Sequence, residues 1–130
     1  MKTITTWKSG ETFESSYHNG TIEIDSKQGF SPKALLLSGL AGCAGVDMVM
    51  ILEKMRVPFA GLVIDVETEQ TDTPPRVFKE IYMTFRIKTG EENRDKVKRA
   101  IDLSLEKYCG VAAMLKKHSG IHYQLNIIQE

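Results

Sequence analysis

This sequence contains few cysteine, proline and tryptophan residues, and it has no net charge. Its 130 residues include two cysteines, four prolines and one tryptophan, and 17 basic residues balance 17 acidic ones. A net charge of zero argues against nucleic acid as a partner, because proteins that bind it carry a basic patch or stripe. It also leaves little electrostatic resistance to self-association.

The chain lacks the signals that would direct it out of the cytoplasm. Met1–Trp7 has no apolar stretch of the kind found in a secretory signal. The apolar run Ala34–Leu52 approaches the length of a membrane span, but Asp47 and three glycines interrupt it. We therefore expect a cytoplasmic protein with no membrane partner. The cysteines of such a protein stay reduced, so a disulfide between them would be transient or catalytic.

The sequence predicts one domain, residues 1–130, that starts with a three-stranded meander. Residues rich in threonine, isoleucine and aromatics predict strands at Lys2–Lys8, Thr12–His18 and Thr21–Asp25. Ser9 and Gly10 form the expected first turn, and Asn19 and Gly20 the expected two-residue loop of a hairpin.

A long helix is predicted next, from Ser31 to Met55. Ser31 has the side chain of an N-cap and Pro32 suits the first helical position, while Pro58 ends the helix. The helix is apolar on nearly all sides, which predicts that it is buried on most of them. Its glycines recur every third residue (Gly39, Gly42, Gly45) and need a reason, such as the close approach of another backbone. A second subunit is the natural cover for such a helix.

The rest of the chain is predicted as two strands, two helices and a last strand. Leu62–Thr71, Val77–Lys88 and Ile121–Ile128 alternate between apolar and polar residues. Glu91–Tyr108 is predicted as an amphipathic helix whose inner face is formed by Val97, Ile101, Leu105 and Tyr108. Val111–Lys117 is predicted as a short helix with Cys109 at its N-terminal edge. The order β-β-β-α-β-β-α-β, with that short helix before the final strand, is typical of an α+β fold.

The two cysteines are the most informative residues. Cys43 lies within the long apolar helix, between glycines, and Cys109 precedes Gly110 near the start of the short helix. If the two thiols meet in the fold, the protein is a candidate for thiol–disulfide chemistry. If they do not meet, each is a small buried hydrophobic residue.

These segments together resemble the OsmC/Ohr superfamily, the proteins of osmotic induction and organic hydroperoxide resistance. Ser31–Cys43 is similar to the first-cysteine helix of that family, Asp47–Arg56 to its continuation, and Glu106–Val111 to its second-cysteine motif. The resemblance covers nearly the whole chain. It implies an OsmC-like fold, an intertwined homodimer with central helices flanked by sheets.

The resemblance also implies an activity. Active members are cysteine-dependent peroxidases, antioxidant proteins of the oxidative stress response that reduce organic hydroperoxides. By analogy Cys43 is the peroxidatic thiol and Cys109 the resolving one, and the physiological thiol reductant stays unidentified. Active members also carry a glutamate early in the first-cysteine helix and an arginine in the N-terminal strands. In this chain the region of that glutamate is Pro32–Ala34, which contains no acidic residue, and no arginine precedes Arg56. We therefore expect slow turnover if the protein is a peroxidase.

Asp47 is a third candidate for the catalytic site. It follows Cys43 by one helical turn and shares its face. A carboxylate there would disfavour the thiolate by like-charge repulsion, or it could accept the thiol proton. It could equally be a buried acid paired with a lysine or a backbone donor.

Neither a cofactor nor a metal is expected. The three histidines (His18, His118, His122) do not have the spacing of zinc ligands with cysteine or carboxylate residues. The alternative to a peroxidase is a non-catalytic OsmC-like dimer that binds a small apolar ligand in an interfacial pocket. A structural protein without a small ligand is a third reading.

Overall fold

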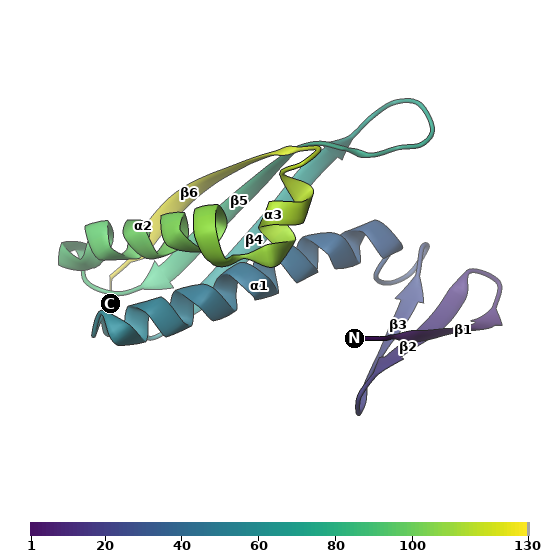
Figure 1. Cartoon of the computed structure of the whole chain (residues 1–130), viewed down its shortest axis with the longest axis horizontal. Helices are drawn as coiled ribbons and strands as arrows, with labels where there is room; N and C mark the ends of the chain where they lie inside the picture. Colours follow the sequence, from purple (N-terminus) through teal and green to yellow (C-terminus); the bar gives the residue numbers. More distant parts are fainter. Residues whose placement is uncertain (130) are drawn as a thin grey trace. The chain divides into compact units, whose positions relative to one another are not determined.

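The computed structural model describes residues 1–129, and the backbone divides into two compact units, Met1–Ser38 and the part from Gly39 onward. Figure 1 shows the elements in chain order. They are β1 (Ile4–Ser9), β2 (Thr12–Tyr17), β3 (Gly20–Asp25), α1 (Pro32–Lys54), β4 (Leu62–Gln70), β5 (Phe78–Lys88), η1 (Glu91–Asn93), α2 (Arg94–Leu103), η2 (Ser104–Tyr108), α3 (Gly110–Leu115) and β6 (Gly120–Ile128). This order confirms the predicted α+β class.

The first unit contains the predicted antiparallel meander, although Ser9 pairs with Thr12, so its first turn is Gly10 and Glu11 and not Ser9 and Gly10 as predicted. β2 is its central strand, and Phe13 lies opposite both Trp7 of β1 and Ile24 of β3. Asp25 ends β3 and accepts hydrogen bonds from the backbone N–H groups of Lys27 and Gln28, at 2.9 and 3.2 Å. These bonds lower the pKa of Asp25 and fix the loop that leads to α1.

The turn between β2 and β3 differs by one residue from the prediction. Tyr17 pairs with Gly20, so His18 and Asn19 form the loop and Gly20 begins the strand. His18 adopts a φ of 51°, in the left-handed region that histidine enters more readily than most residues. The glycine is therefore not needed inside this turn.

The long helix α1 begins where the capping residues predict. The backbone N–H of Ala34 donates to Ser31 Oγ at 3.2 Å, and Pro32 is the first helical residue. The helix ends at Lys54, shortly before Arg56, which has a φ of 57°.

Within this chain α1 is buried along one stripe, not on most sides as predicted. Leu40, Ala44, Met48 and Leu52, spaced by four residues, are fully buried. In contrast, Val46 is 62% exposed and Met50 is 53% exposed. α1 is also long and apolar enough to cross a membrane. Length and apolar composition alone are weak evidence for a membrane span, because the core helix of a soluble protein has both properties.

The second unit contains a mixed sheet in the order β4-β5-β6. β4 is antiparallel to β5, whereas β6 is parallel to it and is reached through the helices. α1 and α2 lie over one face of this sheet (Figure 1). The core of this unit combines side chains from the sheet and from both helices, among them Ile81, Met83, Phe85 and Ile87 of β5, Met48 and Leu52 of α1, and Val97 and Ile101 of α2.

The predicted alternation of β5 is confirmed except at its start. Ile81, Met83, Phe85 and Ile87 are buried as predicted. Phe78 is buried as well, although strict alternation would place it on the other face of the strand. The register between β4 and β5 shifts between Thr68 and Gln70, which pairs with Phe78. Such an irregularity changes which face a side chain points to.

The helix predicted at Glu91–Tyr108 is three segments. It opens with the 3₁₀ turn η1, continues as α2, and ends in η2, a π-helical segment closed by the bond from Cys109 N to Ser104 O at 2.7 Å. Val97, Ile101 and Leu105 are buried as predicted, but Tyr108 is 55% exposed. The wider π turn changes the angular position of the residues that follow, so the prediction of Tyr108 on the inner face is wrong.

Candidate functional site

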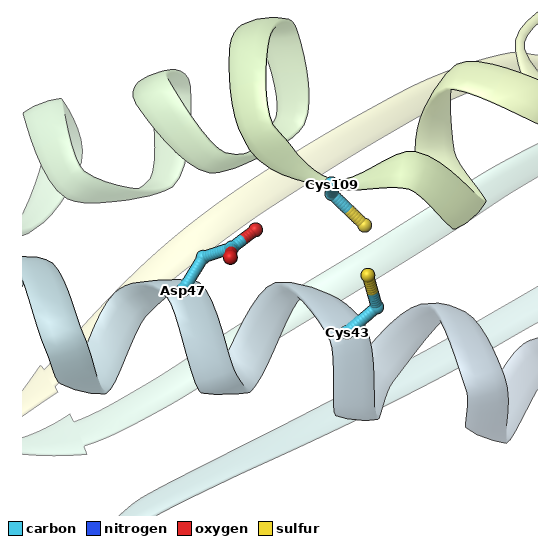
Figure 2. A group of neighbouring side chains, drawn as sticks. All are labelled: Cys43, Asp47 and Cys109. Carbon is cyan, nitrogen blue, oxygen red and sulfur yellow. The ribbon is translucent and has the colours of Figure 1, made fainter.

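Helix α1 places Cys43 and Asp47 on one face, one turn apart. Both side chains are half-buried, and the fully buried Ala44 and Met48 anchor the neighbouring face of the helix in the core. Figure 2 shows both side chains projecting from α1 toward the segment that carries Cys109. As the helical spacing predicted, Cys43 and Asp47 therefore lie on the same face of α1.

Cys109 lies at the junction between η2 and α3. It leaves helical geometry with a φ of −76° and a ψ of 105°, and it is the N-cap of α3, where its Sγ accepts a hydrogen bond from Ala112 N at 3.4 Å. The side chain is 3% exposed. The π turn of η2 thus ends with the thiol directed inward at the start of α3.

The structure brings all three candidate residues together. The Sγ atoms of Cys43 and Cys109 and a carboxylate oxygen of Asp47 lie within 4.8 Å of one another, and Figure 2 shows the two sulfur atoms facing each other. Both cysteines are free thiols. Of the two possibilities left open by the sequence, the two thiols meet.

The surroundings of Cys109 favour its neutral form. Burial raises the pKa of this thiol to about 11, and its hydrogen bond with Cys43, the charge of Cys43 and that of Asp47 act in the same direction. The N–H of Ala112 opposes them and lowers the pKa. Burial outweighs this bond, so Cys109 is protonated at neutral pH.

Ser104 is a member of the site that sequence reasoning missed. It is fully buried, and its Oγ lies 3.0 Å from Asp47 Oδ2, to which it donates, and 3.5 Å from the carbonyl oxygen of Ala44. The hydroxyl therefore joins the π segment to α1 and holds the carboxylate. A signal was available, because Ser104 is a polar residue between the inner-face positions Ile101 and Leu105.

Two of the lysines near Cys109 in the sequence have other partners. Lys116 Nζ donates to the carbonyl oxygen of Leu105, and Lys107 Nζ lies 5.4 Å from the centre of the Tyr108 ring. The first of these bonds further ties α3 to η2.

A pocket of about 590 Å³ opens beside Asp47. Its wall is mainly apolar and includes two cations, Lys54 and Arg99. It is lined by Asp47, Met50, Ile51, Lys54, Met55, Arg99, Leu103 and Tyr108. Because Asp47 belongs both to this wall and to the thiol cluster, a molecule in the pocket would lie next to the cysteines.

Comparison with known proteins gives a consistent family. The sequence profile of the family described as OsmC-like protein matches residues 25–124. Protein YhfA of Escherichia coli K12 is 35% identical over 133 residues, covering 98% of each chain.

Solved structures share the fold. The crystal structure of an OsmC-like protein from Mycoplasma pneumoniae superposes with a TM-score of 0.86 at 18% identity, covering 98% of this chain and 96% of that one. The organic hydroperoxide resistance protein OhrB of Bacillus subtilis gives a TM-score of 0.65 at 16% identity, with 96% of each chain covered. From the profile match and the sequence identity to YhfA, the chain belongs to the OsmC-like protein family.

Proposed function

We propose that this protein is a thiol-dependent hydroperoxide reductase in which Cys43 is the peroxidatic thiol and Cys109 the resolving thiol. The observation that carries the proposal is the meeting of two free thiols from segments far apart in the sequence, within 4.8 Å. Membership of the OsmC-like family and a shared fold with an organic hydroperoxide resistance protein support a redox role.

The proposed reaction needs only the two thiols and a hydroperoxide. The Cys43 thiolate attacks the distal oxygen of ROOH, an S–O bond forms, the O–O bond breaks, and the alkoxide takes the proton given up by Cys43. Cys109 sulfur then attacks Cys43 sulfur, and the hydroxyl leaves as water with the Cys109 proton. The hydroperoxide is reduced to an alcohol and the dithiol is oxidised to a disulfide, which an external thiol reductant returns to the start.

The exposure of the two cysteines supports the proposed division of roles between them. Cys43 is half-buried, so it is the thiol that a substrate can reach, whereas Cys109 is 3% exposed and protonated. A buried, protonated thiol is a poor first nucleophile because the thiolate is the reactive form. It suits a second step in which its partner sulfur is already beside it.

Asp47 is proposed to receive the proton from a thiol and pass it to the departing oxygen. Its carboxylate lies beside both sulfur atoms, and Ser104 fixes one of its oxygens at 3.0 Å. A nearby base matters most for Cys109, whose raised pKa would otherwise leave it unreactive at neutral pH.

Turnover is expected to be slow. In the N-terminal strands the cations are Lys8 and, just before them, Lys2, and arginine is absent before Arg56. An ammonium group lacks the planar, bidentate fork of guanidinium, so it would orient a thiolate less firmly than the arginine of active members.

Counting free thiols tests the proposal. The reduced protein is mixed with cumene hydroperoxide under argon, and its free thiols are titrated with Ellman's reagent. We expect two thiols to disappear in wild type. In Cys109→Ser the one remaining thiol should be converted to a sulfenic acid that dimedone traps, and Cys43→Ser should consume hydroperoxide no faster than buffer.

A variant on the outer face of the sheet provides the matched control. Glu67→Gln changes an exposed carboxylate on β4 and should oxidise like wild type. Full retention of both thiols in excess hydroperoxide would refute the proposed activity.

A second function is favoured by the pocket of about 590 Å³ beside Asp47, whose wall is mainly apolar. In that case the family member binds a small apolar ligand without catalysis. It predicts saturable binding of an apolar fluorescent probe that Leu103→Glu abolishes, together with thiols that hydroperoxide leaves unchanged.

A further inference from the structure

We propose that the reduced cluster of Cys43, Asp47 and Cys109 is a binding site for one thiophilic divalent cation of the zinc class. Three donor atoms, two sulfur and one oxygen, lie within 4.8 Å of one another. The expectation of no metal was argued from histidine spacing, and this cluster contains no histidine. It is formed by tertiary contact between α1 and the η2–α3 junction.

The spacing is close to that of a zinc site before the metal enters. Bonds of about 2.3 Å to sulfur and about 2.1 Å to oxygen place tetrahedral ligands roughly 3.3–3.8 Å apart. From a separation of at most 4.8 Å the donors would have to contract by about 1.5 Å or less, which side-chain rotation can supply. Cys43 and Asp47 are held one turn apart on a rigid helix, and Cys109 faces them (Figure 2).

Hydrogen bonds already orient two of the three ligands. Ser104 donates to Asp47 Oδ2 at 3.0 Å and so orients the carboxylate, one oxygen of which lies within 4.8 Å of both sulfur atoms. Ala112 N donates to Cys109 Sγ at 3.4 Å, a bond that stabilises a thiolate. Outer partners of this kind set ligand orientation in metal sites and affect affinity strongly.

The donor set selects the class of metal. Two thiolates and one carboxylate match soft or borderline ions such as Zn²⁺, Co²⁺ and Cd²⁺, whereas Mg²⁺ and Ca²⁺ prefer oxygen ligands throughout. Two thiolates and a carboxylate carry three negative charges, which a divalent cation reduces to one. The three protein ligands leave a fourth position for water or an external ligand.

Metal binding and thiol chemistry would exclude each other. The metal takes both sulfur atoms as thiolates and releases their two protons to solvent, so neither sulfur is free to attack a hydroperoxide or an alkylating agent. Metal uptake itself does not rest on the proposed peroxidase activity, because it requires only the reduced cluster.

Cobalt spectroscopy on the reduced protein tests the site. Co²⁺ is added under argon to protein freed of reductant, and the near-ultraviolet sulfur-to-cobalt band and the visible d–d bands are recorded. We expect saturation at one ion per chain, visible bands of four-coordinate intensity, and loss of colour on addition of Zn²⁺. Zn²⁺ affinity is then measured by competition with a chromophoric chelator.

The variants assign the ligands. Cys43→Ser and Cys109→Ser should each lose the one-per-chain site, and Asp47→Asn should weaken Zn²⁺ binding at least about tenfold while both thiols stay intact. Glu67→Gln on the outer face of β4 is the matched control and should bind like wild type. Circular dichroism and a Zn²⁺-induced rise in Tm, present in wild type and lost in Asp47→Asn, separate ligand loss from unfolding.

Three results would overturn the site. They are cobalt spectra without a sulfur band, Zn²⁺ binding that survives removal of both cysteines, and an affinity unaltered by Asp47→Asn. The metal assay contains no hydroperoxide and the thiol assay contains no metal, so the failure of one proposal leaves the other standing.

Discussion

At the scale of single residues, two identical thiols have different environments. Cys43 projects from a continuous helix and is half-buried, whereas Cys109 is 3% exposed and caps a short helix. Asp47 lies beside both, and Ser104 holds its carboxylate. The two thiols therefore differ in burial and share one hydrogen-bonded carboxylate as a neighbour.

The ionisation of Cys109 gives a pH prediction. In Cys43→Ser the single thiol of the folded protein should react with iodoacetamide at a rate that rises well above pH 9, because burial remains the largest cause of its raised pKa. Removing the Cys43 thiol removes a smaller contribution, so the midpoint should fall somewhat below the value of about 11. The measurement is the alkylation rate against pH, read by mass spectrometry. A midpoint at or below pH 9 would contradict the buried environment.

The raised pKa of Cys109 also predicts how the stability of the protein changes with pH. The folded state holds the Cys109 proton more tightly than the unfolded state, so this stabilisation is complete below the unfolded pKa near 9 and is lost as pH rises to about 11. The midpoint of urea denaturation in wild type should therefore decrease across that window. In Cys109→Ala this part of the decrease should be absent, and an equal decrease in the two proteins would argue against the linkage.

Ser104→Ala tests the contact between η2 and α1. The substitution removes the donor to Asp47 and leaves a half-buried carboxylate without this partner, so the free energy of unfolding should fall by about 1–3 kcal/mol. Urea denaturation measures the change. Ser38→Ala, at an exposed position of α1, should stay within about 0.5 kcal/mol of wild type, and an equally small effect of Ser104→Ala would contradict the role.

The sequence was sufficient to name Cys43, Asp47 and Cys109, because their reactive side chains and helical spacing can be read directly. The sequence marks Ser104 as a polar residue on the inner face of a helix, but it does not show which group Ser104 contacts. Its role depends on a contact with α1 across a long separation in sequence, and on a π turn that no composition signal announces. Local sequence patterns do not reveal tertiary contacts of this kind.

At the scale of elements, local chemistry predicted the start of α1 and the presence of both hairpins, but it placed each hairpin loop one residue away from its position in the structure. Ser31 and Pro32 carry a capping signal, and strand alternation predicted the buried face of β5. The π segment η2 has no such signal, and it is why Tyr108 is exposed. The loop at His18 and Asn19 was misplaced because a histidine took the positive φ that was expected of a glycine.

The cap of α1 gives a prediction at this scale. Ser31→Ala removes the acceptor for Ala34 N, so the free energy of unfolding should fall by about 1 kcal/mol. Ser31→Asp keeps an acceptor at the same position and should stay close to wild type. Urea denaturation of the three proteins measures the difference, and a Ser31→Asp variant as unstable as Ser31→Ala would show that the bond is not responsible.

At the scale of the whole molecule, α1 presents an apolar face that one chain does not cover. A groove of about 610 Å³ runs along it, lined by Ala41, Gly42, Gly45, Val46, Val49, Met50, Leu62 and Ile64. A Cβ at Gly45 would lie 3.2 Å from Ile64 Cδ1, whereas one at Gly42 would meet nothing within 4 Å among the described residues beyond its chain neighbours and the adjacent backbone of α1. The glycine row thus has an explanation inside the chain at Gly45 and is open at Gly42, where a second backbone could approach.

We predict that this face joins two copies of the chain, as the sequence and the resemblance both suggested. Val46→Glu places a charge where Val46 is 62% exposed in the groove, and burying an unpaired carboxylate in a subunit interface is costly. Light scattering at micromolar concentration should give twice 14.6 kDa for wild type and 14.6 kDa for the variant. Val63→Glu is the matched control, because Val63 is equally apolar, is 51% exposed on β4 and lies outside the groove. A monomeric wild type would exclude the dimer, and dissociation by both substitutions would show that the groove is not the specific contact.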